Sequence, residues 1–125
     1  MTFPPRISDT EWQIMKICWA RPSTSAQEII DALSAREDWH PKTVKTLLNR
    51  LVKKKALGFE KSGRAYLYHP LVVEADCVAA ESRSFLDRVF GGSLQPMLAH
   101  FVQSRKLSPN EVAELKNLLK QKERK

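Results

Sequence analysis

The segment HPKTVKTLLNRLVKKKAL, residues 40–57, constrains the fold more than any other part of the chain. Read at helical spacing, it places apolar side chains on one face: Val44, Leu47, Leu48, Leu51 and Val52. The opposite face carries cations and hydrogen-bonding groups: Lys42, Lys45, Thr46, Asn49, Arg50 and Lys53. Such a helix packs on a small core and offers its polar face to a DNA major groove, where these residue types contact base edges and phosphates. A basic face that meets only solvent is the alternative for an isolated helix.

The positive charge of the chain is concentrated around this segment. The 125 residues include 21 basic and 14 acidic side chains, which gives a net charge of +7. Residues 40–64 alone carry eight bases and one acid, whereas residues 65–115 carry four bases and six acids. A local cationic patch in a chain with a pI of about 9.7 indicates a polyanionic partner, most simply nucleic acid.

Two helices are expected before this segment, and each begins at a capping box. Ser8 and Glu11 open the first helix, and Ser25 and Glu28 open the second. In each pair the Ser at the N-cap and the Glu three residues later satisfy N–H groups that the helix leaves free. Pro41 suits the first position of the third helix.

The hydrophobic period changes from helical to alternating near residue 58. Residues 59–61 and 65–69 are predicted to form two short strands around a turn at residues 62–64. Three helices followed by a basic hairpin define a winged helix-turn-helix, a fold that is mainly α with a small β-hairpin wing. We place this DNA-binding domain in residues 1–70, and in this order the basic third helix is expected to bind DNA.

Residues 71–125 are predicted to form a helical dimerisation domain. Three short amphipathic helices are expected there, and the last of them begins at a third capping box, Ser108 and Glu111. Together the three helices have too little mutual surface to build a core of their own. A second copy of the chain is the simplest partner. The side chains expected at the dimer interface are Val78, Phe85, Leu86, Val89, Leu98, Phe101, Val102, Val112, Leu115 and Leu119.

The candidate DNA contacts belong to the third helix and to the wing. The helical residues expected to face the groove are Lys42, Thr43, Lys45, Thr46, Asn49 and Arg50. Lys53 and Lys54 are expected to meet phosphate or solvent, and so to add affinity rather than sequence reading. Lys61 and Arg64 at the wing tip are expected in a minor groove or along the DNA backbone. Tyr66 is either a phosphate contact or a packing residue.

Other classes of function find less support in the sequence. We expect no enzyme, because there is no Gly-rich phosphate loop, no carboxylate cluster and no nucleophile beside a base. His40, His69 and His100 lack ligand spacing to Cys18 or Cys77, so no metal or cofactor is predicted. The cysteines are expected to be buried free thiols. Without a signal peptide or an apolar run of membrane-spanning length, the protein is expected in the cytoplasm.

Five segments together resemble the penicillinase-repressor family, the BlaI/MecI/CopY type of bacterial winged-helix transcriptional repressors. In chain order they are ISDTEWQIMKICW, KTVKTLLNRLVKKKAL, GRAYLYHP, FLDRVFGGS and LSPNEVAELKNLL, and they span nearly the whole sequence. The resemblance implies a homodimer that binds a palindromic operator in double-stranded DNA. It also implies that residues up to about 70 bind DNA and that the remainder dimerises.

Two branches of this family end repression in different ways. In the penicillinase branch, a membrane-embedded sensor system triggers proteolysis at an Asn-Phe bond in the dimerisation region. The corresponding bond here is His100-Phe101, which keeps the Phe and replaces the Asn. In the copper-responsive branch, Cys-x-Cys motifs near the C-terminus bind metal. No cysteine follows Cys77, so copper sensing by that route is not expected.

Two further hypotheses stay open at the level of sequence. A small-molecule-responsive winged-helix regulator would hold its ligand among the C-terminal helices, and that ligand would raise the thermal stability of the protein. A sequence-neutral architectural protein would bind operator and scrambled duplex with equal affinity. The operator sequence and the inducing signal are not encoded in any pattern of the chain.

Overall fold

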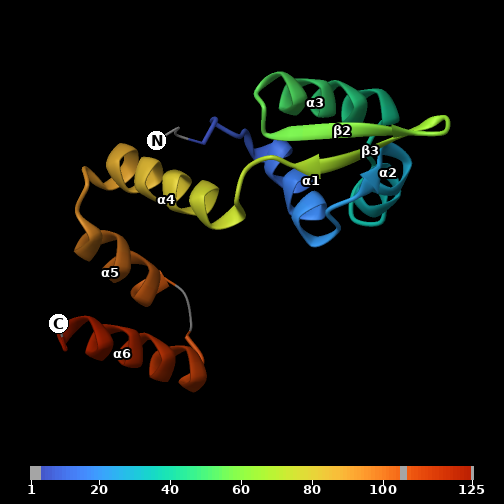
Figure 1. The fold of residues 1–125 in the computed structure, drawn as a ribbon. Helices are drawn as coiled ribbons and strands as arrows, with labels where there is room; N and C mark the ends of the chain where they lie inside the picture. The colour runs from blue at the N-terminus through green and yellow to red at the C-terminus, as the bar shows by residue number, and fades with distance from the viewer. Residues whose placement is uncertain (1–3, 105–106, 125) are drawn as a thin grey trace. The chain divides into compact units, whose positions relative to one another are not determined.

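The computed structural model describes residues 4–104 and 107–124. The chain divides into two compact units, residues 1–82 (unit 1) and residues 83–125 (unit 2). The elements of unit 1 are α1 (Asp9–Ala20), β1 (Thr24–Ser25), α2 (Ala26–Ser34), α3 (Pro41–Lys53), β2 (Leu57–Ser62), β3 (Ala65–Pro70) and the first turns of α4 (Glu74–Phe90). Unit 2 holds the remainder of α4, α5 (Leu94–Ser104) and α6 (Pro109–Glu123) (Figure 1).

Each capping box predicted from the sequence is present at the N-terminus of a helix. Ser8 and Glu11 cap α1, Ser25 and Glu28 cap α2, and Ser108 does the same for α6 together with Glu111. In all three boxes the Ser hydroxyl accepts from the N–H at position N3, and the Glu carboxylate accepts from the N–H of the Ser. The helix starts were therefore predictable from local sequence.

The sheet has three antiparallel strands in the order β1-β3-β2. The wing is the β2–β3 hairpin, whose tip extends beyond the neighbouring helices (Figure 1). Ser62 pairs with Ala65, so the turn between them has two residues. The first of these, Gly63, has φ of 63°, as in the type II′ turn that favours hairpin twist. Both strands are longer than predicted, and the pairing of Thr24 with Tyr68 in β1 was not anticipated.

The apolar core lies within unit 1. It is formed by side chains from α1, α2 and α3 together with the start of β2: Ile14, Met15, Cys18, Ile29, Leu33, Val44, Leu48, Leu51 and Leu57 are nearly or fully buried. The apolar face predicted for α3 is thus the face that packs inward. Its polar face is left at the surface, which is the condition for contacting DNA.

The division between the units falls inside α4 rather than near Pro70. The first turns of α4 belong to unit 1 because they pack against α1. The Trp19 indole N–H donates to Val72 O at 3.0 Å, and the Lys16 ammonium lies 2.6 Å from a carboxylate oxygen of Glu74. Cys77 on α4 is buried in the same core. The functional boundary at residue 70 remains a prediction.

Candidate nucleic-acid interface

The recognition-helix candidate α3 is held by its N-cap and by its buried apolar face, and it leaves its polar face exposed. His40 is the N-cap residue, and its Nδ1 accepts the backbone N–H of Lys42 at 3.1 Å. The inward side chains Val44, Leu47 and Leu48 are buried. The outward side chains are all exposed, and they are the ones predicted to meet DNA: Lys42, Thr43, Lys45, Thr46, Asn49, Arg50 and Lys53.

A cleft of about 490 Å³ joins this face of α3 to the wing. Lys45 and Asn49 line it from α3, while Arg64 and Tyr66 line it from the hairpin. Four of the predicted DNA contacts, from segments about fifteen residues or more apart, therefore share one concave surface. Cations and hydrogen-bonding groups around a concavity favour an anionic ligand such as the DNA backbone.

The start of α2 forms a third wall of the cleft that the sequence did not reveal. Ser25, Ala26 and Gln27 line it beside the α3 and wing residues. They are brought there because Ser25 pairs with Leu67 of β3. The capping box predicted a helix start at Ser25, but only the strand pairing shows that this start lies next to the wing.

The wing carries an aromatic cluster next to its basic residues. The Phe59 ring contacts the Tyr66 ring edge-on, with centroids 5.1 Å apart, and the Tyr68 ring at 6.1 Å. Tyr66 therefore packs against Phe59 while its side chain remains 46% exposed, so both of its predicted roles are compatible with its position. Burial raises the pKa of the Tyr68 phenol, with smaller contributions from Tyr66 and Cys18.

Lys61 lies on the outer strand of the wing. It pairs with Tyr66 across the hairpin, and its side chain is exposed. It lies close to the tip of the wing and does not line the cleft. Its position suits a contact with a backbone phosphate beside the cleft.

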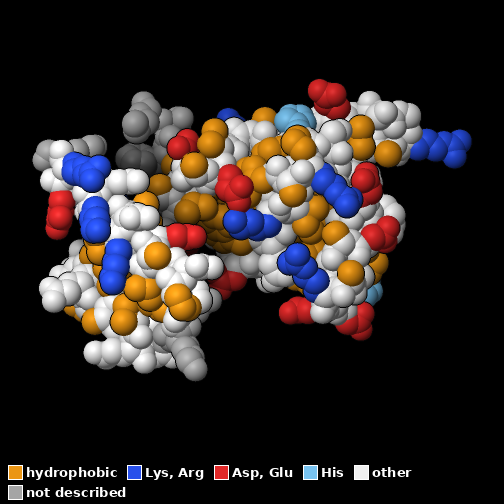
Figure 2. Space-filling view, turned by 90° about the horizontal axis from the view of Figure 1, so that it is seen from below, with side chains coloured by type: hydrophobic (Ala, Val, Ile, Leu, Met, Phe, Trp, Pro, Cys, Tyr) orange, Lys and Arg blue, Asp and Glu red, His pale blue; other side chains and the backbone are white. Residues whose placement is uncertain are grey.

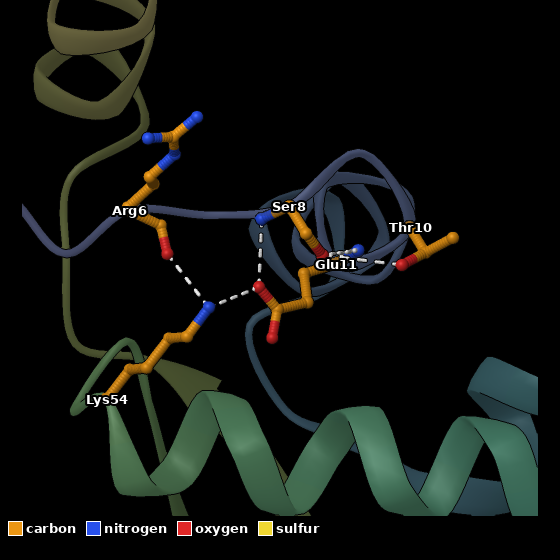
Figure 3. A network of polar contacts seen from close by, with 5 residues as sticks. All are labelled: Arg6, Ser8, Thr10, Glu11 and Lys54. Atoms are coloured by element: carbon orange, nitrogen blue, oxygen red, sulfur yellow. Dashed lines mark hydrogen bonds and ion pairs between the residues drawn. The ribbon is translucent and has the colours of Figure 1, made fainter.

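Lys54 is a predicted DNA contact whose charge is paired inside unit 1. Its ammonium lies 2.5 Å from Glu11 Oε1 and donates to Arg6 O at 2.9 Å (Figure 3). Glu11 is only 1% exposed. Burial raises the pKa of the Glu11 carboxyl, but Lys54 and the N–H and hydroxyl of Ser8 outweigh that effect, and the net pKa is lowered. This ion pair was not predicted from the sequence.

The residues predicted to form the dimer interface are placed on three helices with little burial of their own. Phe85, Leu86 and Val112 are half-buried. The other predicted interface residues are exposed: Val78, Val89, Leu98, Phe101, Val102, Leu115 and Leu119. Hydrophobic side chains reach the surface over the helices of unit 2, at the left of Figure 2. Their role in dimerisation stays a prediction.

The His100–Phe101 bond lies inside α5. Both side chains are exposed, and their rings contact at 5.8 Å. The His100 carbonyl accepts the Ser104 hydroxyl at 2.6 Å, in addition to being part of the helix. A protease that cuts this bond must therefore unwind α5 locally, because an extended backbone is needed to expose a peptide carbonyl.

Cys18 and Cys77 are buried free thiols, as predicted, and burial raises the pKa of Cys18 to about 11. Within residues 4–104 and 107–124, no three His, Cys, Asp or Glu side chains gather in a way that suits a metal ion. No helix in the described part of the chain has both the length and the apolar character that a membrane span requires.

The fold and the cationic surface define a winged-helix protein of the DNA-binding class. The penicillinase repressor family matches residues 7–121. The penicillinase repressor of Bacillus licheniformis is 41% identical over 117 residues, which cover 94% of this chain and 91% of that protein. The methicillin resistance regulatory protein MecI of Staphylococcus aureus strain N315 is 36% identical, covering 93% and 94% respectively. The chain belongs to the penicillinase repressor family.

A solved structure extends this comparison to a complex with DNA. The monomeric form of BlaI from Bacillus licheniformis has been determined with the blaP half-operator. It is 43% identical, with a TM-score of 0.53, and the match covers 61% of this chain and 93% of that one. The winged-helix fold is confirmed by this likeness. Members of the family are DNA-binding regulators, which also confirms the prediction that the chain is not an enzyme.

Proposed function

We propose that this protein is a transcriptional repressor that binds operator DNA through α3 and the wing. The observation that carries the proposal is the cleft in which Lys45 and Asn49 of α3 meet Arg64 and Tyr66 of the hairpin. Support also comes from the related BlaI protein, whose structure was solved with a half-operator. The protein would act in the cytoplasm, where its DNA is.

The exposed face of α3 divides into base-reading and phosphate-binding residues. Thr46, Asn49 and Arg50 carry donors and acceptors that suit base edges in the major groove. The Thr46 hydroxyl donates to Lys42 O at 3.0 Å, which leaves its lone pairs free to accept from a base. Lys53 lies near the end of the helix and suits a phosphate. Mutation of a base-contacting residue should therefore change sequence discrimination, whereas mutation of a phosphate-contacting residue should change affinity for all sequences.

The proposed repressor is a homodimer on a palindromic operator. The exposed apolar side chains of unit 2 need a cover, and a second copy of the chain supplies an identical apolar surface. Two linked winged helices would hold two half-sites at once, so the second contact forms at a high effective concentration. Dimerisation therefore raises the affinity for the operator in this proposal, although unit 2 itself contacts no base.

Repression would end by proteolysis within unit 2. A membrane sensor protease system is the partner we propose, and the bond is His100–Phe101. Cutting there would release Phe101, Val102 and the whole of α6 from the rest of the chain. The dimer would weaken, and operator affinity would fall with it because a monomer holds one half-site.

Base reading is tested by comparing Arg50→Ala and Thr46→Ala with Lys53→Ala on two duplexes. One duplex is selected from a random pool by the wild-type protein, and the other is its scrambled form. Loss of a base contact should cost about 1–3 kcal/mol on the selected duplex and reduce discrimination. Lys53→Ala should weaken both duplexes alike and lower the salt slope by about one unit. Equal losses for all three variants on both duplexes would contradict the groove assignment.

The release mechanism is tested without the protease by ending the chain at His100. This truncated protein should be largely monomeric in sedimentation and should bind the selected palindromic duplex poorly. A chain ending at Lys120, which keeps most of α6, is the control for truncation as such. If the protein that ends at His100 still dimerises and binds normally, release at this bond is excluded.

A further inference from the structure

The buried carboxylate of Glu11 is not explained by helix capping. Glu11, Glu28 and Glu111 make the same capping box at the starts of three helices. The Glu28 side chain is 49% exposed and Glu111 is exposed as well, whereas the Glu11 side chain is 1% exposed. Taking a carboxylate out of water is unfavourable unless a counter-charge and hydrogen bonds compensate it. Glu11 therefore has a second role.

The compensating charge comes from the far end of the recognition helix. Figure 3 shows the Lys54 side chain reaching from the end of α3 to a position between Arg6 and Glu11. Its Nζ is 2.5 Å from Glu11 Oε1, the same oxygen that accepts the Ser8 N–H at 2.8 Å. A third contact, to Arg6 O at 2.9 Å, ties the segment before α1 to the same ammonium.

Lys54 is well placed to transmit this contact to α3. It is the C-cap residue of the helix, and its N–H donates to Arg50 O at 2.9 Å. The next two N–H groups, of Lys55 and Ala56, donate back to Val52 O and Leu51 O, the pair of bonds that defines a Schellman motif. The backbone around Lys54 is thus fixed to the last turn of α3, so its ion pair with Glu11 links that turn to the start of α1.

We propose that Glu11 and Lys54 form a positioning pair that holds α3 in the orientation that DNA binding requires. This inference rests on the proposed role of α3. Lys54 acts through Glu11 rather than through a phosphate, although it belongs to the same basic run as Lys53 and Lys55. Its charge is already compensated inside the protein, so it should displace no counterion when DNA binds. Removing it should therefore leave the salt dependence of affinity unchanged.

The test compares Lys54→Met with the neighbouring substitution Lys53→Met in the full-length protein. Both remove one ammonium and keep a side chain of similar length. Affinity for the selected duplex is measured against salt concentration by fluorescence anisotropy. Lys54→Met should weaken binding roughly tenfold with an unchanged salt slope, as expected for a residue that acts through a neighbour. Lys53→Met should lower the slope by about one unit.

Two further variants separate positioning from general stability. Glu11→Gln keeps an oxygen that accepts the Ser8 N–H but loses the charge, and it should match Lys54→Met in both affinity and slope. Lys54→Arg keeps the charge and should restore most of the affinity. Circular dichroism at the assay temperature shows that each protein is folded, and deuterium exchange of the last turn of α3 should be faster in Glu11→Gln and Lys54→Met than in Lys53→Met. If Glu11→Gln does not fold, Lys54→Met carries the test alone.

Each outcome decides the proposal. A lower salt slope in Lys54→Met would identify Lys54 as a phosphate contact and overturn the positioning role. Unchanged affinity in folded Lys54→Met would overturn it as well. Failure of the proposed function looks different, because the wild-type protein itself would then fail to distinguish the selected duplex from the scrambled one. Faster exchange at the end of α3 remains measurable without DNA in that case.

Discussion

The two units of this protein solve the problem of burying apolar side chains in different ways. In unit 1, three helices and a small sheet enclose a core whose members, such as Ile14, Leu48 and Leu51, have no exposed surface. In unit 2, helices α5 and α6 contain no buried residue at all within their described spans. The same type of amphipathic helix thus finds its partner inside the chain in one unit and lacks it in the other.

This difference indicates which step of DNA binding requires dimerisation and which does not. Unit 1 completes its core within one chain, so the orientation of α3 and the wing is set intramolecularly. Unit 2 exposes residues such as Leu118 and Leu119, at 60% and 62%, and in the proposed dimer a second copy of the chain covers that surface. Base reading should therefore survive in a monomer, whereas binding to a palindromic operator should not.

The largest expected effect comes from placing a charge in the apolar surface of unit 2. Leu115→Asp should yield monomers, because each copy would bring a carboxylate into the proposed interface. Affinity for a palindromic duplex should fall by about 10²-fold or more, since the two half-site contacts lose their linkage. Asn117→Asp, on the same helix, is the control for added charge. A wild-type protein that sediments as a stable monomer at micromolar concentration would contradict the interface.

Truncating one leucine in each unit should affect a self-contained core and a dimer interface differently. Leu48→Ala leaves a cavity in the core of unit 1 and should lower the free energy of unfolding by about 2–5 kcal/mol. That loss should not depend on protein concentration. Leu119→Ala should instead shift the melting temperature in a concentration-dependent way, because it weakens a dimer rather than a core. Thermal unfolding at several concentrations distinguishes the two, and a concentration-independent effect of Leu119→Ala would count against a dimer.

The buried ion pair predicts a smaller, pH-dependent effect in unit 1. The pKa of Glu11 is lowered in the folded protein below its ordinary value of 4.5. Its contribution to stability is therefore complete above that value and is lost as pH falls through the lower, folded-state pKa. The free energy of unfolding should fall less steeply in this acid range for Glu11→Gln than for wild type. Equal slopes for Glu11→Gln and wild type would exclude the effect.

The smallest expected effect concerns Lys55, the residue that follows the C-cap of α3. Lys55 has φ of 65°, in the left-handed region where side chains other than Gly are strained. Lys55→Gly removes this strain, although it also increases the freedom of the unfolded chain, so the net gain in stability should be at most about 1 kcal/mol. Lys55→Ala, which keeps the strain, separates the backbone effect from loss of charge. A Gly variant less stable than the Ala variant would refute this explanation.

Local sequence was sufficient for the parts of the fold that depend on near neighbours. The helical stripe of Val44, Leu47 and Leu48 predicted which face of α3 would be buried. Capping boxes located the starts of three helices, since Ser and Glu three residues apart interact within one turn. Gly63 likewise marked the turn of the wing. Each of these signals involves residues that the chain itself holds close together.

The features that the sequence did not reveal all depend on long-range contacts. The short strand β1 became visible only through its pairing with Tyr68 and Leu67. Lys54 looked like one more cation in a basic run, and its contact with Glu11 joins residues 43 positions apart. The start of α2 joined the cleft for the same reason. Tertiary pairing, rather than residue type, determines these placements, so a pattern-based prediction has no means to find them.

The most direct test of the proposed division of labour is to measure half-site preference in a monomer. The Leu115→Asp protein is titrated against a duplex carrying one half-site of the selected sequence and against its scrambled form. The dissociation constant for the scrambled duplex, divided by that for the half-site duplex, should equal the ratio that the wild-type protein shows on the same duplexes. Adding Arg50→Ala to the monomer should then reduce the ratio. A monomer that binds both duplexes equally would show that sequence reading depends on unit 2, which contradicts the account.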